Sequence, residues 1–277
     1  MTIRRLETRD RPQAETVWRD IFEESPAFAS YYFDRRFCPE HAFGAFDADR
    51  LVAMVHGRPT EIVVEQKAYP ALLVAGVATL PEYRNRGLMH RLMALLIDHA
   101  QSNGFSCCYL HPVSETLYAS LGFQNGTDAL IVRSDDTRVH EPFTCTEQFD
   151  ADAMLSVYHA LQQTHSGMEL RDETELNVVF ADYATEDAKV MSAFAEDRTA
   201  GYIIYNDSGS VFELMALHPS AYAFLLDEAA KRCGKEIKAI VPIDCGIPGE
   251  RVYSMQYLVF NHAFPLPLKN GFCRLAY

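Results

Sequence analysis

Hydrophobic and polar positions along the first 135 residues repeat with two periods, one typical of strands and one typical of helices. Apolar residues recur at helical spacing after Asp10 and after Pro26, and most regularly at 88, 92, 95 and 96. Shorter apolar runs rich in Val, Ile and aromatic residues are typical of strands. The pattern predicts strands at 2–6, 42–47, 51–59, 61–66, 71–80, 106–110 and 128–133, and helices after Asp10, from Pro26 and at 87–102.

Turn-forming residues mark the limits of these elements. Asp47-Ala48-Asp49 predicts a turn after the second strand, and Arg58-Pro59 predicts another between 51–59 and 61–66. Tyr118 is expected on a short helix, and Gly122-Phe123 on the approach to the closing strand.

The same order of elements begins again after a polar, aperiodic segment at 134–142. The second half predicts strands at 143–149, 188–195, 201–205, 211–217 and 237–242, and helices after Asp150, at 173–183 and at 221–233. We therefore expect two domains, residues 1–135 and 143–277, each with a mixed sheet flanked by helices (α/β, or α+β). An unrelated α+β domain in the second half is the alternative.

Composition fits an ordinary folded protein of this size. The chain has 277 residues, 48% of them hydrophobic and 23% charged, which favours two domains. No run of 18 apolar residues occurs and the N-terminus lacks a signal-peptide core, so we expect a cytoplasmic protein. The seven cysteines include no C-x-x-C pair, which favours reduced thiols over disulfides or a zinc site, and no metal is expected.

The formal net charge of −13 argues against nucleic acid or an anionic membrane as a partner. An acidic surface attracts cations such as a protonated amine, although solubility alone also explains this charge. The oligomeric state cannot be derived from the sequence.

A strand that passes through a basic turn into a helix is the feature with the clearest chemistry. The apolar run 71–80 ends at Pro81, and Gly87 precedes the helix. The first N–H groups of a helix and its positive dipole end form an anion site, to which Arg84, Arg86 and His90 add charge or donors. The pattern indicates phosphate or pyrophosphate, whereas an ordinary turn with surface arginines is the alternative.

Two motifs in this order resemble those of the Gcn5-related N-acetyltransferases (GNAT). Arg84-x-x-Gly87-x-Met89 is similar to the family's pyrophosphate-binding pattern, with Met89 where the family has a small residue. A Met or Leu here resembles the branch of the mycobacterial "enhanced intracellular survival" (Eis-like) acetyltransferases. Ser114-Glu115-x-x-Tyr118-x-x-x-Gly122-Phe123 is similar to a second motif of that branch. The resemblance extends over residues 1 to about 133.

The resemblance implies tandem GNAT folds with acetyl-coenzyme A as cosubstrate. Its pyrophosphate would lie on the turn, its pantetheine arm beside the preceding strand, and Ser114 within reach of that arm. The residues implied in cofactor binding are Val77, Ala78, Thr79, Arg84, Asn85, Arg86, Gly87, Leu88, Met89, His90 and Ser114. The second copy would be degenerate, because His218-Pro219-Ser220 contains neither arginine nor glycine. Proteins of this branch carry a third, sterol-carrier-like domain, for which we expect no room here.

Acyl transfer from a thioester to an amine requires a stabilised oxyanion and a proton for the departing thiolate. A backbone N–H between Gly76 and Thr79 is expected to meet the carbonyl oxygen. The resemblance implies Tyr118 as the proton donor. The general base stays open between His111, His56, a water route, and the carboxylate of Tyr277, which the resemblance implies.

Two functions from different classes therefore remain. The first is an acetyl-coenzyme A-dependent N-acetyltransferase acting on an amine of a small molecule or peptide. The second is a non-catalytic coenzyme A-binding or structural protein with the same fold. Tyr118 and the Arg84/Gly87 turn favour the enzyme, whereas Met89 and the missing base favour the second reading.

Overall fold

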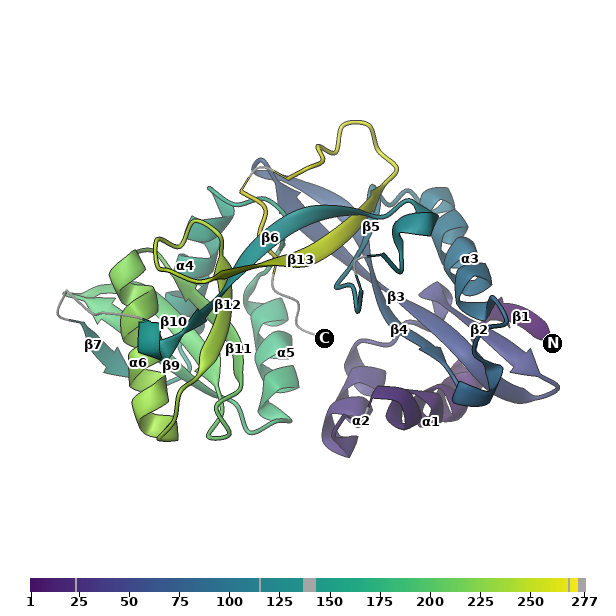
Figure 1. The fold of residues 1–277 in the computed structure, drawn as a ribbon, viewed down its shortest axis with the longest axis horizontal. Helices are drawn as coiled ribbons and strands as arrows, with labels where there is room; N and C mark the ends of the chain where they lie inside the picture. Colours follow the sequence, from purple (N-terminus) through teal and green to yellow (C-terminus); the bar gives the residue numbers. More distant parts are fainter. Residues whose placement is uncertain (23, 115, 137–142, 269, 274–277) are drawn as a thin grey trace.

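The chain folds into two lobes, each with helices against a sheet, joined by strands that pass from one lobe to the other (Figure 1). The computed structural model describes residues 1–277 except 23, 115, 137–142, 269 and 274–277. In the first half the elements are β1 (Thr2–Arg5), η1 (Thr8–Asp10), α1 (Arg11–Phe22), α2 (Pro26–Arg35), η2 (Pro39–His41), β2 (Ala42–Asp47), β3 (Arg50–Val64), β4 (Lys67–Thr79), η3 (Pro81–Tyr83), α3 (Leu88–Ser102), β5 (Cys107–Leu110), η4 (Ala119–Leu121), β6 (Gln124–Arg133) and η5 (Ser134–Asp136). In the second half they are β7 (Thr144–Thr146), α4 (Ala151–Gln162), β8 (Met168–Glu169), α5 (Glu173–Ala184), β9 (Lys189–Ala195), β10 (Arg198–Tyr205), β11 (Val211–Ala216), α6 (Pro219–Cys233), β12 (Lys238–Pro242) and β13 (Glu250–Val259).

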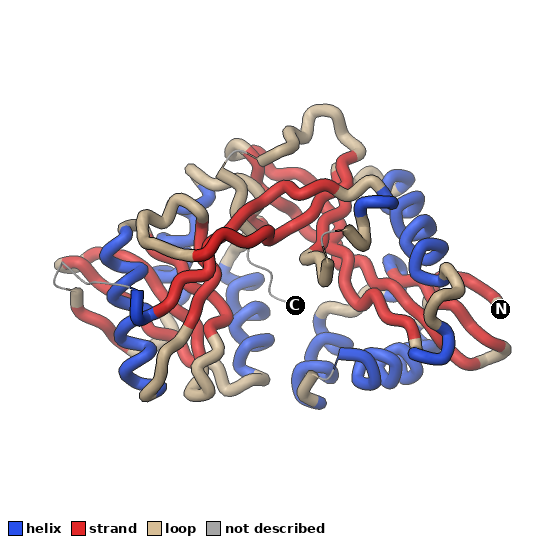
Figure 2. Tube along the Cα trace, in the orientation of Figure 1, coloured by secondary structure: helices blue, strands red, loops and turns tan. Residues whose placement is uncertain are grey.

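A large mixed sheet begins in the first lobe and continues through β13, β6 and β12 into the second lobe (Figure 1). Its strands lie in the order β1-β2-β3-β4-β5-β13-β6-β12, with β8 paired to β3. The β4–β5 pair is parallel and the other pairs are antiparallel. Helices α1 and α2 cover one side of β2–β4 and α3 covers the other (Figures 1 and 2). The predicted class, a mixed central sheet flanked by helices, is confirmed.

A smaller sheet, β11-β10-β9-β7, organises the second lobe. Strand alternation explains how it holds helices on both faces. Ile203 and Tyr205 pack with α6, whereas Tyr202 and Ile204 pack with α4 and α5. The order of strands and helices therefore repeats that of the first lobe, as the hydrophobic pattern predicted.

The predicted turn at Arg58-Pro59 is wrong. Residues 50–64 form one continuous strand, β3, in which Pro59 lies opposite Leu72 of β4. β2 pairs with β3 only as far as His56, so Pro59 lies where the other edge of β3 has no neighbour in the described pairings. A proline is tolerated there because no ladder hydrogen bond needs its missing N–H.

Strand β13 was not predicted, and it joins the two halves. It pairs with β5 through Gln256–Val259 and with β6 through Glu250–Tyr257. Figure 1 shows β6 and β13 together as a ribbon that runs from one lobe to the other. A strand from the C-terminal half thus completes the sheet that begins in the N-terminal half.

Buried charged groups also lie between the halves. Arg36, directly after α2, contacts Asp182 of α5 at 3.0 Å, and Arg58 of β3 contacts Glu169 of β8 at 2.6 Å. All four residues are nearly inaccessible to solvent. Because a buried charge is costly without a partner, these pairs fix how the two halves are placed.

Two further sequence predictions concern the state of the cysteines and the presence of membrane-spanning helices. None of the seven cysteines forms a disulfide in the described structure, and four of them are buried. Over the described ranges, no helix has both the length and the apolar character needed to cross a bilayer.

Candidate active site

The start of α3 presents a row of backbone N–H groups. The first backbone hydrogen bond of the helix joins Arg91 N–H to Gly87 O at 3.2 Å. The N–H groups of residues 85–90 have no acceptor elsewhere in the described part of the chain. Arg84, Asn85, Arg86 and Gly87 are exposed. An anion at this position would meet unpaired donors and the positive end of a helix of 15 residues.

The backbone conformation at position 87 favours glycine, whereas steric crowding does not. Its φ is 69°, in the left-handed region, and it precedes the first residue of α3. A Cβ placed on it would meet no other atom within 4 Å. The space that a side chain would fill is therefore open in front of the unpaired N–H groups.

Basic side chains are held beside this turn by the backbone that precedes it. Arg84 donates from Nε to the carbonyl oxygen of Thr79 at 3.2 Å, and Arg86 donates to that of Glu82 at 2.8 Å. His90 contacts Ser120 Oγ through Nε2 at 3.2 Å. The contact between His90 and Ser120 places the Arg84–Met89 motif next to the Ser114–Phe123 motif.

The end of β4 has an unpaired edge. β4 pairs with β5 only through Ala71, Leu72 and Leu73, and the two strands then separate. Over residues 74–79 the β5-facing edge of β4 has no strand partner in the described pairings. An extended ligand with amide groups can hydrogen-bond to such an edge as an added strand would. Val77 and Thr79 are partly exposed here, and Ala78 is buried.

A β-bulge interrupts β4 at the same level. Met54 pairs with Ala78 and His56 with Ala75, so Val55 alone lies opposite both Gly76 and Val77. Gly76 has a φ of 55°, as expected of a glycine in a bulge of this kind. The bulge leaves backbone groups of β4 that β3 does not pair.

Tyr118 lies at the start of η4 with an unpaired hydroxyl group. The side chain packs in the core beside Phe123, with 4% of the residue exposed. The hydroxyl has no hydrogen-bond partner among the described residues and is not one of the fully enclosed polar atoms. Desolvation raises the pKa of Tyr118, so the phenol holds its proton at neutral pH.

The remaining residues that were predicted to bind the cofactor differ in whether their backbone or their side chain is available to a ligand. Leu88 is buried and Met89 is partly buried in the core of the first lobe, so their backbone N–H groups and not their side chains face the turn. Ser114 is exposed and lies 3.3 Å from Thr116 Oγ1. Glu115 and Tyr277 lie outside the described residues.

His56 is a poor general base in this environment. Its imidazole is enclosed by Trp18, Tyr32, Phe33 and Phe37, and its Nε2 has no partner in the described structure. Burial lowers the pKa of His56 to about 3, so the ring is neutral but weakly basic at pH 7. His111 is exposed and directly follows β5, which keeps it a candidate.

Sequence reasoning missed Glu24, which follows α1. Trp18 donates from Nε1 to Glu24 Oε2 at 2.6 Å, and the Trp18 ring lies 2.7 Å from where a Cβ of Gly76 would be. Desolvation raises the pKa of Glu24. This carboxylate is thus connected to the bulge through one indole ring, a link between two distant segments that no sequence pattern could reveal.

Among the described residues, the start of α6 in the second lobe has no equivalent set of unpaired donors. Pro219 opens α6 without an N–H group, and the N–H groups of Ala221 and Tyr222 both donate to His218 O. The start of α6 therefore offers far fewer unpaired donors than the start of α3, in agreement with the absence of arginine and glycine.

Comparison with known proteins agrees with this geometry. The model of the acetyltransferase (GNAT) domain matches residues 2–126, which include both the α3 turn and Tyr118. Residues 2–126 are therefore similar to a GNAT acetyltransferase domain. No curated protein matches the sequence. Over the described residues, no group of three or more His, Cys, Asp or Glu side chains is arranged to hold a metal.

Solved structures share the fold over both halves of the chain. A conserved protein from Enterococcus faecalis, described as a probable N-acyltransferase, aligns with a TM-score of 0.72 and 17% identity over 93% of this chain and 72% of its own. Eis1 from Mycobacterium abscessus aligns with a TM-score of 0.69 and 17% identity, over 94% and 74%. A GCN5-related N-acetyltransferase from Kribbella flavida gives 0.67 and 18%, over 93% and 70%. The folds of both lobes thus occur together in other proteins.

Proposed function

We propose that the protein is an acetyl-coenzyme A-dependent N-acetyltransferase that acetylates an amine of a small molecule or peptide in the cytoplasm. The observation that carries this proposal is the row of unpaired N–H groups at residues 85–90, in front of open space at Gly87. A GNAT domain supports acyl transfer as the reaction class.

The pyrophosphate of acetyl-coenzyme A would accept hydrogen bonds from the amides of residues 85–90. Arg84, Arg86 and His90 would add positive charge or donors around it. The pantetheine amides would pair with the unpaired edge of β4 at Val77 and Thr79, with Ala78 between them and Ser114 close to the arm. These contacts would hold the thioester beside the bulge.

At the bulge, a backbone N–H of residues 76–79 would stabilise the oxyanion that forms when the amine attacks. The tetrahedral intermediate then breaks its carbon–sulfur bond, and the thiolate of coenzyme A leaves. Tyr118 would supply the proton to that thiolate, because its hydroxyl has no competing partner.

Glu24 is the group that we propose to receive the acceptor amine. An amine is protonated at neutral pH, and it must lose a proton before it attacks. A half-buried carboxylate next to the Trp18 indole, with its pKa raised by desolvation, attracts the ammonium group and can accept that proton.

Thiol release from acetyl-coenzyme A, measured with a panel of amines, tests the proposed activity. We expect turnover with at least one amine, and a fall in kcat of about 10²-fold or more in Tyr118→Phe with little change in the KM for acetyl-coenzyme A. Tyr257→Phe is the control, since it removes a buried hydroxyl in a different hydrophobic cluster from that of Tyr118. Tight coenzyme A binding without turnover on any amine would instead establish a binding protein.

The role of Glu24 is tested by the pH dependence of kcat. The parent is expected to lose activity as the pH falls through the raised pKa of Glu24, because the protonated carboxyl cannot accept a proton. Glu24→Gln should lower kcat and remove this acidic limb. A Glu24→Gln profile that keeps the same limb would assign the base to another group, such as His111.

A further inference from the structure

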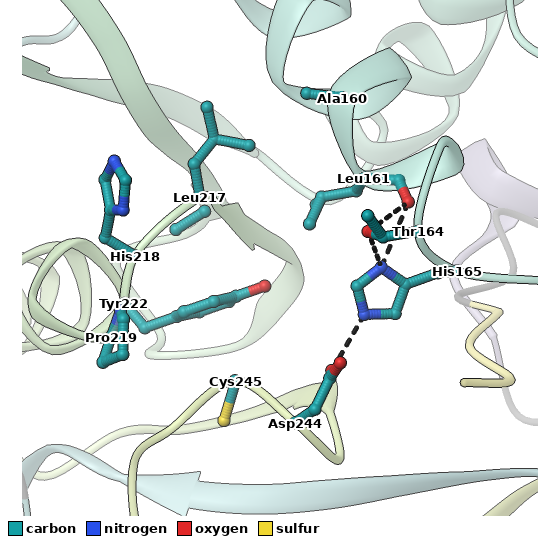
Figure 3. A pocket seen from close by; sticks show the side chains of 11 residues that line it. Ala160, Leu161, Thr164, His165, Leu217, His218, Pro219, Tyr222, Asp244 and Cys245 are labelled. Atoms are coloured by element: carbon teal, nitrogen blue, oxygen red, sulfur yellow. Dashed lines mark hydrogen bonds and ion pairs between the residues drawn. The ribbon is translucent and has the colours of Figure 1, made fainter.

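A separate cavity lies in the second lobe, between the end of α4, the end of β11 and the start of α6 (Figure 3). Its volume is about 310 Å³, at the small end of the range for ligand pockets. Apolar side chains form much of its wall, among them Leu161 and Leu217. It occupies the place in this lobe that the α3 turn and the end of β4 occupy in the GNAT domain.

Tyr222 points its hydroxyl into this cavity. Figure 3 shows the oxygen atom between Leu217 and His165. Only 2% of the residue is exposed, and the hydroxyl has no hydrogen-bond partner in the described structure. Burial raises the pKa of Tyr222, so the phenol keeps its proton at neutral pH. A buried donor without an acceptor is costly, and a ligand oxygen would remove that cost.

One wall of the cavity favours an anionic oxygen at this point. The amino end of α6, with His218 and Pro219, forms one wall and carries partial positive charge. The carboxylate of Asp244 lies on the opposite side, but His165 Nε2 contacts it at 2.8 Å. His165 is fixed from its other side, because Nδ1 lies 2.9 Å from Thr164 Oγ1 and 3.1 Å from Leu161 O.

The cavity does not suit a pyrophosphate. Pro219 has no N–H group, and the amides of Ala221 and Tyr222 are already bonded to His218 O. A single oxygen-bearing group with an apolar body matches one free phenolic donor and apolar walls better than a diphosphate does.

We propose that this cavity is a second ligand site, which binds a small monocarboxylate with its oxygen on the Tyr222 hydroxyl and its apolar body against Leu161 and Leu217. The site is independent of the proposed acetyltransferase activity.

Three probes with the same apolar chain test it: butyrate, butyramide and butylamine. The leucine methyl signals of Leu161 and Leu217 would be followed by NMR during titration of the full-length protein. We expect butyrate to shift both signals saturably, butyramide to bind more weakly, and butylamine to bind weakest. Tyr222→Phe should weaken butyrate binding by about tenfold, since one hydrogen bond to a charged group is lost.

Two control variants separate this site from the others. Tyr257→Phe removes another buried, unpartnered hydroxyl outside the cavity, and it should bind butyrate as the parent does. Gly87→Glu should also bind butyrate normally, and coenzyme A should not compete with it, whether or not the protein acetylates amines. Equal affinity for butylamine, unchanged binding in Tyr222→Phe, or no shift at about 100 mM butyrate would each overturn the proposal.

Discussion

At the start of α3, Gly87 combines a φ of 69° with open space where a Cβ would lie. Gly87→Glu would place a carboxylate in front of the unpaired amides and repel a diphosphate. We expect it to abolish coenzyme A binding in calorimetry, with a loss of stability of only about 1–2 kcal/mol from the left-handed backbone.

Gly104 provides the matched control. Its φ is 78°, a Cβ on it would also meet nothing within 4 Å, and it lies past the other end of α3. Gly104→Glu should lose similar stability and keep coenzyme A affinity. Equal coenzyme A affinity in both variants would contradict binding at the α3 turn.

His56 gives a prediction about pH and stability. Burial lowers its pKa to about 3, so between about pH 6.5 and 3 the unfolded chain binds a proton that the folded chain does not. Stability is therefore lost as the pH falls through this window. In urea unfolding at pH 7.5 and 5, His56→Gln should lose about 2 kcal/mol less than the parent between the two values.

An exposed histidine serves as the reference for this comparison. His262→Gln should show the same loss as the parent, since His262 is exposed. An identical loss in His56→Gln would mean that the buried imidazole does not contribute to acid sensitivity.

At the scale of elements, the sequence pattern predicted those features that depend on residues close together in the chain. The helical spacing of Leu88, Leu92 and Leu96 and the cap at Asp150 depend on neighbours in sequence. β13 escaped prediction because it is paired on both edges and buries the polar residues Ser254 and Gln256, which breaks strict alternation. Its content of Val, Tyr and Leu was the one sequence feature that could have indicated a strand here.

In the candidate site, too, only features that depend on local sequence could be predicted. The α3 turn and Tyr118 were predicted from motifs, and whether they bind and react as proposed stays a prediction. The bulge at Gly76 and the Trp18–Glu24 contact could not be predicted, because they depend on register between strands and on packing of α1.

The position of β13 yields a prediction about the limits of the N-terminal domain. Residues 1–135 alone lack both β13 and β12, so β5 is left with an unpaired edge and β6 without a partner strand. We expect this fragment to be aggregated or poorly structured by circular dichroism and gel filtration. A monomeric, cooperatively folding fragment would show that the N-terminal domain folds without β13.

At the scale of the whole molecule, buried ion pairs connect the halves. Glu169 accepts hydrogen bonds from both Arg58, at 2.6 Å, and Tyr109, at 2.5 Å. Glu169→Gln would leave the buried Arg58 charge without its partner and should lower the free energy of unfolding by about 3–5 kcal/mol. Asp207→Asn, which breaks the exposed pair with Lys189, should have a much smaller effect in the same urea unfolding experiment.

A crystal structure with coenzyme A tests the central claim most directly. The account predicts pyrophosphate oxygens within hydrogen-bond distance of the amides of residues 85–90, pantetheine along residues 74–79 of β4, and the sulfur atom beside the Tyr118 hydroxyl. Coenzyme A bound elsewhere, with those amides facing solvent or capped by the protein's own side chains, would contradict it.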